Sequence, residues 1–335
     1  MADRVIVVGA TRGRQKVPAS EISQMIGRVG REHSGSECVA TIIVDESNAQ
    51  ELVADMENKD SHFVGSTLAD KQIVAFHILP EICTGSVQNV EDARQWYTRS
   101  LGALQKEKPP FEKAFGLLES VRAIRFLNEG AVATDLGKIA SRFYFHPSDV
   151  SAWMDSFTKV FELGLECDDF AVAWALACAP TMRASGDFGK HWEVVQRYKD
   201  SLPPGLDSSK SGVVTGTLWW HILGGPPVGK MRSQSLSLKR DAGRIMNAMK
   251  ELDARVANWK MIDFFDDLAW RVRRSIPSSL ASLCKLPGIT KSKALYLRSE
   301  GIIDKEGIKT AISQLKQDVD ESFYKILKRI ADGVC

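Results

Sequence analysis

The octapeptide QMIGRVGR, which begins at Gln24, combines residue types that can act on a phosphate. Arg28 and Arg31 are three positions apart, so on a helix both side chains project from one face. A phosphoryl-transfer transition state spreads negative charge over the γ-phosphate oxygens, and a planar, permanently charged guanidinium stabilises that charge well. Gly27 and Gly30 have no side chains, so a phosphate could come close to the backbone on this face of the helix. The pattern predicts arginines that act on phosphate, with a basic amphipathic helix carrying incidental glycines as the alternative.

The segment GGPPVGKM, residues 224–231, fits the spacing of a phosphate-binding loop. Such a loop continues with a Ser or Thr whose hydroxyl holds magnesium, but the residue after Lys230 is Met231. Pro226 and Pro227 also remove backbone N–H groups with which a loop of this kind holds phosphate. No apolar strand precedes the segment. We therefore predict that it is not a nucleotide site.

The segment TIIVDES, residues 41–47, has the look of an acidic box after a strand, as in magnesium-dependent ATPases. Carboxylates at the end of a strand also favour the first turn of a following helix. We interpret Asp45 and Glu46 as such a helix-start pair, with a catalytic role as the alternative.

The segment LPGITKSKALYLRSEGI, residues 286–302, predicts a helix-hairpin-helix. Gly288, after a proline, makes the tight turn, and Thr290 can cap the second helix. Backbone N–H groups at the hairpin would then face a phosphate, with Lys291 and Lys293 adding positive charge. Such a hairpin holds the backbone of a nucleic acid without reading its sequence. A helical hairpin that serves packing alone is the alternative.

A second basic segment is the predicted helix over residues 239–259. Arg240 and Arg244 are four positions apart and share a face, which suits contact with successive phosphates, and Lys250 lies further along the same helix. The alternative is a solvated basic face. A further basic cluster precedes the hairpin and consists of Arg271, Arg273 and Arg274.

The bulk composition is that of an ordinary folded protein. The chain has 335 residues, of which 44% are hydrophobic and 26% charged, and its net charge is +2. This near-balance does not indicate a nucleic-acid partner, so that inference depends on local basic patches. The six cysteines and six histidines lack metal-ligand spacing, and no metal site is predicted. No leader-like or membrane-spanning run is seen, so we expect an intracellular, soluble protein of the cytoplasm, nucleoid or nucleus.

The elements that must position these residues fall into two kinds. Two apolar runs, residues 4–9 and 38–44, have the composition of buried strands, and a helix is predicted between them with Ser20 as its N-cap. Strand, helix and strand predict a parallel α/β unit. Two strands are too few for a closed domain, and we expect structure outside this chain, or a partner, to complete it.

After about residue 65 helical patterns dominate, so the fold class is mostly α with a small α/β N-terminal piece. The segment GAVATDLGKIASRFYF starts with what could be a small hairpin after a helix, which suggests a winged helix. The predicted helices used below are 68–84, 90–105, 111–128, 239–259, 261–275 and 315–330.

The motif QMIGRVGR resembles motif VI of superfamily-2 helicases, in the ski-like subgroup that includes archaeal and metazoan DNA-repair helicases. The resemblance continues along the chain in that family's order. Residues 1–8 resemble the segment after motif V, and residues 68–84 with 90–105 resemble the winged-helix entry. Residues 136–147 resemble the turn into the helical ratchet domain. Residues 239–259 resemble the ratchet helix, and residues 271–302 resemble the closing helix-hairpin-helix.

This resemblance implies four parts. Residues 1–66 would form a partial second RecA-like lobe with motif VI, and residues 67–146 a winged-helix domain. Residues 147–275 would form a helical ratchet bundle, and residues 276–335 a helix-hairpin-helix domain. The family's first lobe, with its phosphate loop and DEAD-type box, has no counterpart in this sequence.

The resemblance also assigns roles. Gln24, Gly27, Arg28 and Arg31 would lie against ATP and its Mg²⁺ in the cleft between two lobes, with the two arginines as catalytic arginine fingers. The residues implied to bind DNA are Arg240, Arg244, Lys250, Arg274, Gly288, Thr290, Lys291 and Lys293. The chain departs from the family at two of these positions, because Arg244 replaces an aromatic residue that stacks on a base and Thr290 replaces a glycine.

Three functions fit this reading. The first is the DNA-binding part of a split or truncated 3′–5′ DNA helicase of DNA repair or replication, whose first lobe is on another chain. The second is a non-catalytic module that binds single-stranded or forked DNA. The third is a half-helicase that competes for a place in a host helicase. The intact arginine motif favours the first function, because a binding module has no use for two arginines on a thin helix.

Overall fold

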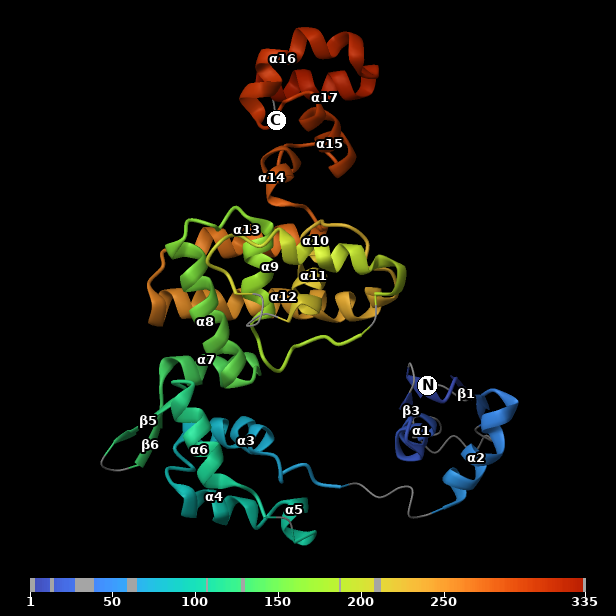
Figure 1. The fold of residues 1–335 in the computed structure, drawn as a ribbon, viewed down its shortest axis with the longest axis vertical. Helices are drawn as coiled ribbons and strands as arrows, with labels where there is room; N and C mark the ends of the chain where they lie inside the picture. Colours follow the sequence, from blue (N-terminus) through green and yellow to red (C-terminus); the bar gives the residue numbers. More distant parts are fainter. Residues whose placement is uncertain are drawn as a thin grey trace. The chain divides into compact units, whose positions relative to one another are not determined.

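The computed structural model of the chain describes residues 4–12, 15–27, 39–58, 65–106, 108–127, 130–186, 188–207 and 212–333. The chain divides into two compact units. The first comprises Met1–Ala69 with Arg99–Lys108, and the second comprises Asp70–Thr98 with Pro109–Cys335. The predicted class is confirmed at this level, since the molecule is mostly helical with a small α/β piece near its N-terminus (Figure 1).

The first unit contains a parallel pair of strands. Strand β1 (Arg4–Val8) pairs in parallel with β4 (Val39–Ile43), in a register that joins Arg4 to Val39 and Val8 to Ile43. Its other elements are β2 (Thr11–Arg12), β3 (Gln15–Lys16), α1 (Ala19–Ile26), α2 (Glu46–Glu57) and α5 (Leu101–Leu104). The predicted order of strand, helix and parallel strand is confirmed, although the N-cap of α1 is Pro18 and not Ser20.

The expectation that these strands are buried is wrong for this unit. Ile6 is 64% exposed and Val8 is 75% exposed. Parallel strands are normally covered on both faces and flanked by further strands. Within the described residues, however, β1 and β4 have only each other as sheet neighbours. Ile6, Val8, Val39 and Ile43 are therefore exposed to solvent.

Asp45 and Glu46 mark the start of a helix, as predicted. Asp45 is the N-cap residue of α2, and its carbonyl oxygen accepts a hydrogen bond from Asn48 N at 2.9 Å. Glu46 then occupies the first turn, where a carboxylate is favoured by the helix dipole.

The second unit begins with helices and a hairpin. Asp70 caps α3, and Gly85, in the left-handed conformation, ends it. The hairpin joins β5 to β6 in antiparallel register from Ile124–Ala133 to Leu127–Gly130, and Thr134 then caps the next helix. The elements are α3 (Lys71–Thr84), α4 (Val90–Tyr97), α6 (Phe111–Ser120), β5 (Ile124–Leu127), β6 (Gly130–Ala133) and α7 (Asp135–Phe143).

Two predicted helices in this stretch are too long. The helix expected over 90–105 ends at Tyr97, and a new N-cap at Ser100, which accepts from Ala103 N at 3.2 Å, starts the short α5. The helix expected over 111–128 ends at Ser120, and the following residues form β5. Local capping and strand pairing thus override the helical periodicity of these segments.

A six-helix bundle forms the largest part of the second unit (Figure 1). Its helices are α8 (Pro147–Glu162), α9 (Asp169–Ala177), α10 (Trp192–Asp200), α11 (Val213–Ile222), α12 (Arg232–Leu252) and α13 (Ile262–Arg274). Aromatic side chains fill its core, where Phe157 packs edge-on against Phe265 with ring centroids 5.2 Å apart. Trp153 and Trp219 are fully buried and belong to this core.

The long helix of the bundle differs at both ends from the predicted helix over 239–259. It begins seven residues earlier, at Arg232, after the short 3₁₀ turn Gly229–Met231. Its α-helical part ends at Leu252, and a π-helical turn over Asp253–Ala257 follows. The buried Asp253 carboxylate accepts from Lys260 N and Met261 N, which fixes the chain as it turns toward α13.

The C-terminal helices have an apolar core of their own, which includes Leu283, Leu297 and Leu327. The helices are α14 (Ser278–Cys284), α15 (Lys291–Ser299), α16 (Lys305–Asp318) and α17 (Glu321–Asp332). The prediction of one helix over 315–330 is wrong. Val319 is extended, and Asp320 caps a new helix by accepting from Phe323 N at 2.9 Å.

Across the described ranges, none of the helices combines the length and the apolar character that a bilayer-spanning segment requires.

Candidate nucleic-acid interface

The phosphate motif lies partly on α1. Gln24 is exposed on this helix, on the side away from the buried Ile22, and Gly27 forms the C-cap with φ −64°. Gly27 therefore does not need the left-handed conformation that only glycine adopts easily. Arg28 and Arg31, the two predicted arginine fingers, lie outside the described residues. Their roles and those of Gln24 and Gly27 stay predictions.

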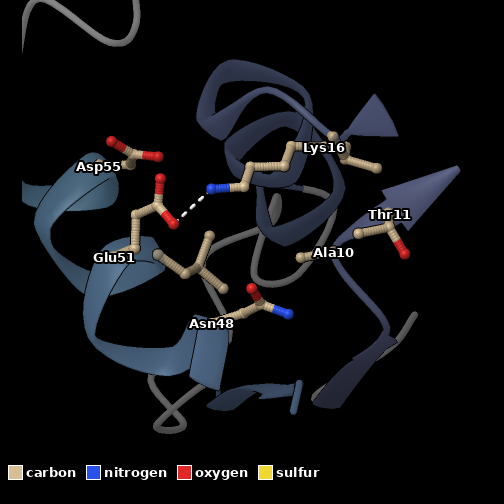
Figure 2. Close-up of a pocket in the computed structure, with 8 residues that line it drawn as sticks. Ala10, Thr11, Lys16, Asn48, Glu51 and Asp55 are labelled. Carbon is tan, nitrogen blue, oxygen red and sulfur yellow. Dashed lines mark ion pairs between the residues drawn. The ribbon is translucent and has the colours of Figure 1, made fainter. Parts of the chain in front are cut away.

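A small pocket in the first unit lies between α2 and the stretch that holds β2 and β3 (Figure 2). Its volume is about 30 Å³, which is room for a water molecule and far less than a nucleotide needs. Lys16 is paired with Glu51 there, and Asp55 also lines the pocket. With two carboxylates and one ammonium group, the lining has the wrong charge for phosphate. We conclude that this pocket is not a nucleotide site.

The segment 224–231 is a connection between two helices. It follows α11, which ends at Ile222, and its last residues form the 3₁₀ turn before α12. Gly224 has φ +106° and packs so tightly that an added Cβ would lie 2.6 Å from Pro277 Cδ. A phosphate-binding loop follows a strand. The structure therefore agrees with the prediction that this segment is not one.

The exposed face of α12 carries the predicted basic stripe. Arg240 is exposed and has no ion-pair partner among the described residues. Arg244, one turn later, is held on two sides: its Nη2 lies 2.8 Å from Asp241 Oδ1, and its guanidinium carbon lies 4.3 Å from the centroid of the Phe145 ring. A guanidinium already stacked on a phenylalanine presents only its outer face to a ligand.

The other predicted contacts near α12 and α13 differ in availability. Lys250 is partly buried, and its Nζ lies 2.7 Å from Asp266 Oδ1, so its charge is already neutralised. Arg274 is exposed and lies over the Trp270 ring at 5.0 Å. The structure therefore leaves Arg274 accessible and gives Lys250 a local partner.

The interpretation of Arg271 as part of an exposed basic cluster is wrong. The residue is only 2% exposed, and its guanidinium lies 2.6 Å from Asp169 Oδ1 and 3.1 Å from Asp267 Oδ2. The second oxygen of Asp169 accepts from Ser278 N at 2.8 Å. This buried ion pair ties α13, α9 and the start of α14 together, which sequence spacing could not reveal.

A turn at Gly288 joins α14 to α15, in the segment where a helix-hairpin-helix is predicted. Gly288 has φ +76°, and an added Cβ would lie 3.1 Å from Ile326 Cγ2 of α17, so both its conformation and its packing favour glycine. Thr290 caps α15 by accepting from Lys293 N, as predicted. The lysines have intramolecular contacts: Lys291 Nζ donates to Ser275 O at 2.7 Å, and Lys293 Nζ lies 4.9 Å from the Phe323 centroid.

A basic pocket that sequence reasoning missed lies at the base of the β5–β6 hairpin. Its volume is about 440 Å³, and four cationic side chains line it: Arg122, Arg125, Lys138 and Arg255. Asp135 also lines the pocket and lies 3.7 Å from Lys138, Arg122 is paired with Asp155 at 2.6 Å, and Arg255 is paired with Glu251 at 3.5 Å. Arg125 has no ion-pair partner among the described residues. The four cations come from three separate segments of the chain, so no local motif could have indicated the pocket.

No family model matches the sequence. The chain is nevertheless related to ATP-dependent DNA helicases.

The relatives are archaeal proteins named ATP-dependent DNA helicase Hel308. The protein of Pyrococcus horikoshii is 23% identical over 98% of this chain and 49% of its own length. That of Thermococcus kodakarensis is 22% identical over 98% of this chain and 32% of its own length. That of Thermoplasma acidophilum is 29% identical over 41% of this chain and 21% of its own length. The chain thus spans half or less of the length of these curated relatives.

Proposed function

We propose that this chain is the DNA-binding C-terminal part of a superfamily-2, 3′–5′ DNA helicase, and that it works with an ATPase lobe carried by another chain. The observation that carries the proposal is the alignment of nearly the whole chain, 98%, with two archaeal proteins named ATP-dependent DNA helicase. Conversion of ATP hydrolysis into movement along single-stranded DNA would use the ATPase lobe together with this chain.

In this proposal three successive parts of the chain, which lie mostly in the second unit, handle DNA. A winged helix over 67–146 would include the β5–β6 hairpin, a ratchet bundle over 147–275 would present the exposed Arg240 on α12, and a helix-hairpin-helix domain over 276–335 would use the turn at Gly288. Unneutralised cations such as Arg125 and Arg240 support contact with the phosphate backbone.

The first unit would supply one wall of the ATP site. Bound Mg-ATP supplies the phosphoryl group whose transfer to water releases free energy. Arg28 and Arg31 would stabilise the charge on that group, and the exposed Gln24 would face the nucleotide from α1. The described residues of this unit fit only this partial role, because the pocket they enclose is small and acidic.

The uncovered strands of the first unit support completion by further structure. Ile6 and Val8 on β1, and Val39 and Ile43 on β4, are exposed apolar residues in one parallel pair. Parallel sheets bury such residues against helices and neighbouring strands. A chain that carries the first lobe and the remaining strands would cover them.

The proposal is tested by ATP hydrolysis with single-stranded DNA present. The chain by itself should show DNA binding without hydrolysis, and hydrolysis should appear when a chain carrying the first lobe is added. DNA binding that never supports hydrolysis with any such chain would favour the non-catalytic module. Hydrolysis by the chain alone that disappears in Lys230→Ala would mean that segment 224–231 is a phosphate loop after all, and the proposal would fail.

A further inference from the structure

A cavity of about 490 Å³ lies where the connection between α11 and α12 meets the C-terminal end of α13. We call it the Ser275 pocket. The connection contributes one wall, and the first two turns of α12 contribute another. The lining residues used below are Pro227, Val228, Arg232, Leu236, Lys239 and Ser275.

Two lysines from different elements meet at Ser275. Lys239 Nζ, from α12, donates to Ser275 Oγ at 2.8 Å, and Lys291 Nζ, from the first turn of α15, donates to Ser275 O at 2.7 Å. Ser275 ends α13 in the left-handed conformation, with φ +52°. Gly224 packs directly behind it, since an added Cβ would lie 3.0 Å from Ser275 O. The two ammonium groups are thus held close together by a rigid corner of the backbone.

These positive charges lack a carboxylate. In the described part of the chain, no acidic side chain forms an ion pair with Arg232, Lys239 or Lys291, whereas Lys250 and Lys285 on the same unit are both paired. Burial, followed by the charge of Lys291, lowers the pKa of Lys239. Two like charges gathered in a partly buried place repel each other, and an anion bound beside Lys239 would relieve that cost.

The remaining wall is apolar. Pro227 and Val228 line one side, and Leu236 is 46% exposed on the face of α12 that also carries Arg232 and Arg240. An inorganic anion gains nothing from an apolar wall, but a nucleotide combines a phosphate with a flat base and the C–H face of a sugar ring, which can pack against apolar side chains. A single strand can turn one nucleotide into a pocket, whereas a base-paired duplex cannot do so without unpairing.

We infer that the Ser275 pocket binds one backbone phosphate of single-stranded DNA between Lys239 and Arg232, with the adjoining nucleotide against Leu236 and Pro227. This inference rests on the proposed function, which supplies the single strand. Lys291 is the first residue of α15, so the pocket joins the basic face of α12 to the helix-hairpin-helix. A DNA single strand bound along α12 would pass through this pocket to the hairpin between α14 and α15.

The test compares single-stranded DNA binding by full-length variants over a range of salt concentrations. Lys239→Gln should weaken binding about tenfold, as the loss of a charge-assisted hydrogen bond predicts. It should also lower the slope of log K against log salt by about 0.7, the value for one phosphate contact on a single strand. Lys239→Arg should retain both. The matched control is Lys309→Gln, whose lysine pairs with Glu306 on α16 away from the pocket.

A second measurement uses the wild-type chain, so it does not depend on whether a variant folds. Acylation of lysines, read by mass spectrometry, should show Lys239 protected by a single-stranded oligonucleotide and much less by inorganic phosphate at equal phosphate concentration. Equal protection by inorganic phosphate would mean that the pocket is a free-anion site and would overturn the strand assignment. Wild-type affinity and slope in Lys239→Gln, with Lys239 unprotected, would overturn the inference while leaving the proposed function intact. Failure of the proposed function looks different, because the wild-type chain would then bind no single strand at all.

Discussion

The two units of this chain bury their apolar residues very differently. In the second unit, large side chains such as Trp153, Phe157 and Trp219 are fully buried in one continuous bundle. In the described residues of the first unit, the buried apolar side chains are Ala19 and Ile22. The hydrophobic effect stabilises the second unit by itself, whereas the first unit exposes the strands that a complete α/β lobe would cover. The contrast supports the proposal that the second unit folds by itself, whereas the first unit depends on further structure to cover its strands.

The largest effect is expected at the phosphate motif of the first unit. In the helicase completed by a first lobe, Arg28→Ala or Arg31→Ala should lower ATP turnover about 1000-fold, which corresponds to about 4 kcal/mol of transition-state stabilisation. Affinity for single-stranded DNA should stay the same, because the second unit carries it. Steady-state ATPase assays beside DNA titrations measure both. Unchanged ATP turnover in both variants would show that the motif has no catalytic role. The proposal that the first unit contributes to ATP hydrolysis would then fail.

A core substitution in the second unit should cost nearly as much, but in stability. Phe157 is fully buried and contacts Phe161, Phe264 and Phe265, so Phe157→Ala should lower the free energy of unfolding by about 3–5 kcal/mol. Chemical denaturation followed by circular dichroism measures the change. Phe126→Ala is the control, because Phe126 is exposed in β5 and should cost less than about 0.5 kcal/mol. Equal effects at the two positions would contradict the assignment of the core.

The free energy of unfolding of the bundle should depend on pH because of Asp149. This carboxylate is buried, it accepts from Thr181 N at 2.9 Å and from the Thr181 hydroxyl, and burial raises its pKa. The folded state therefore keeps the proton after the unfolded chain has lost it. The resulting stabilisation is present below about pH 4, the ordinary pKa of aspartate, and is lost as pH rises through the raised value.

The Asp149→Asn variant tests that sign. An amide can accept from Thr181 N and donate to the hydroxyl, so the variant should keep the contacts and lose the pH-dependent term. Near pH 7 it should be as stable as the wild type or more stable, by up to about 1 kcal/mol, and the advantage should shrink on acidification. Denaturation midpoints at several pH values measure this. An Asn variant that is less stable at neutral pH than at pH 4, relative to wild type, would show that the charged form is the favoured one.

The smallest effect is expected on the uncovered sheet. Val8→Ser should change the stability of the isolated chain by less than about 0.5 kcal/mol, because Val8 is already exposed. Ile22→Ala, by contrast, should speed hydrogen exchange of the β1 and α1 amides, since Ile22 is fully buried. Hydrogen–deuterium exchange with mass spectrometry separates the two. Slow exchange of β1 that Val8→Ser accelerates would mean that this face is already covered in the isolated chain.

The sequence predicted those features that depend on local chemistry. Thr290 caps α15 and Gly288 adopts a positive φ, as expected. Both features could be predicted because helix capping and turn geometry depend on a few adjacent residues. The parallel pairing of β1 and β4 followed from the strand, helix, strand order. Where a local signal was overlooked the prediction failed, as at Asp320, whose cap divides the helix expected over 315–330.

Features that depend on distant residues could not be predicted. Arg271 looked like one more exposed cation, but Asp169, about a hundred positions away, buries and neutralises it. Arg244 lies over Phe145, and Lys291 turns to Ser275 instead of standing free at the hairpin. The Ser275 pocket is lined by the α11–α12 connection, by α12 and by the C-cap residue of α13, which no spacing rule connects. In each case tertiary packing decides which charges remain available to a ligand.

The most direct test of the account is the affinity of the purified chain for single-stranded DNA at increasing salt. The account predicts binding that weakens linearly in log K against log salt, with a slope of about −0.7 for each phosphate contacted. A slope equivalent to several phosphates is expected if the basic face of α12, the Ser275 pocket and the hairpin all contact one strand. No binding at low salt, or binding that does not respond to salt, would contradict the claim that this chain handles DNA.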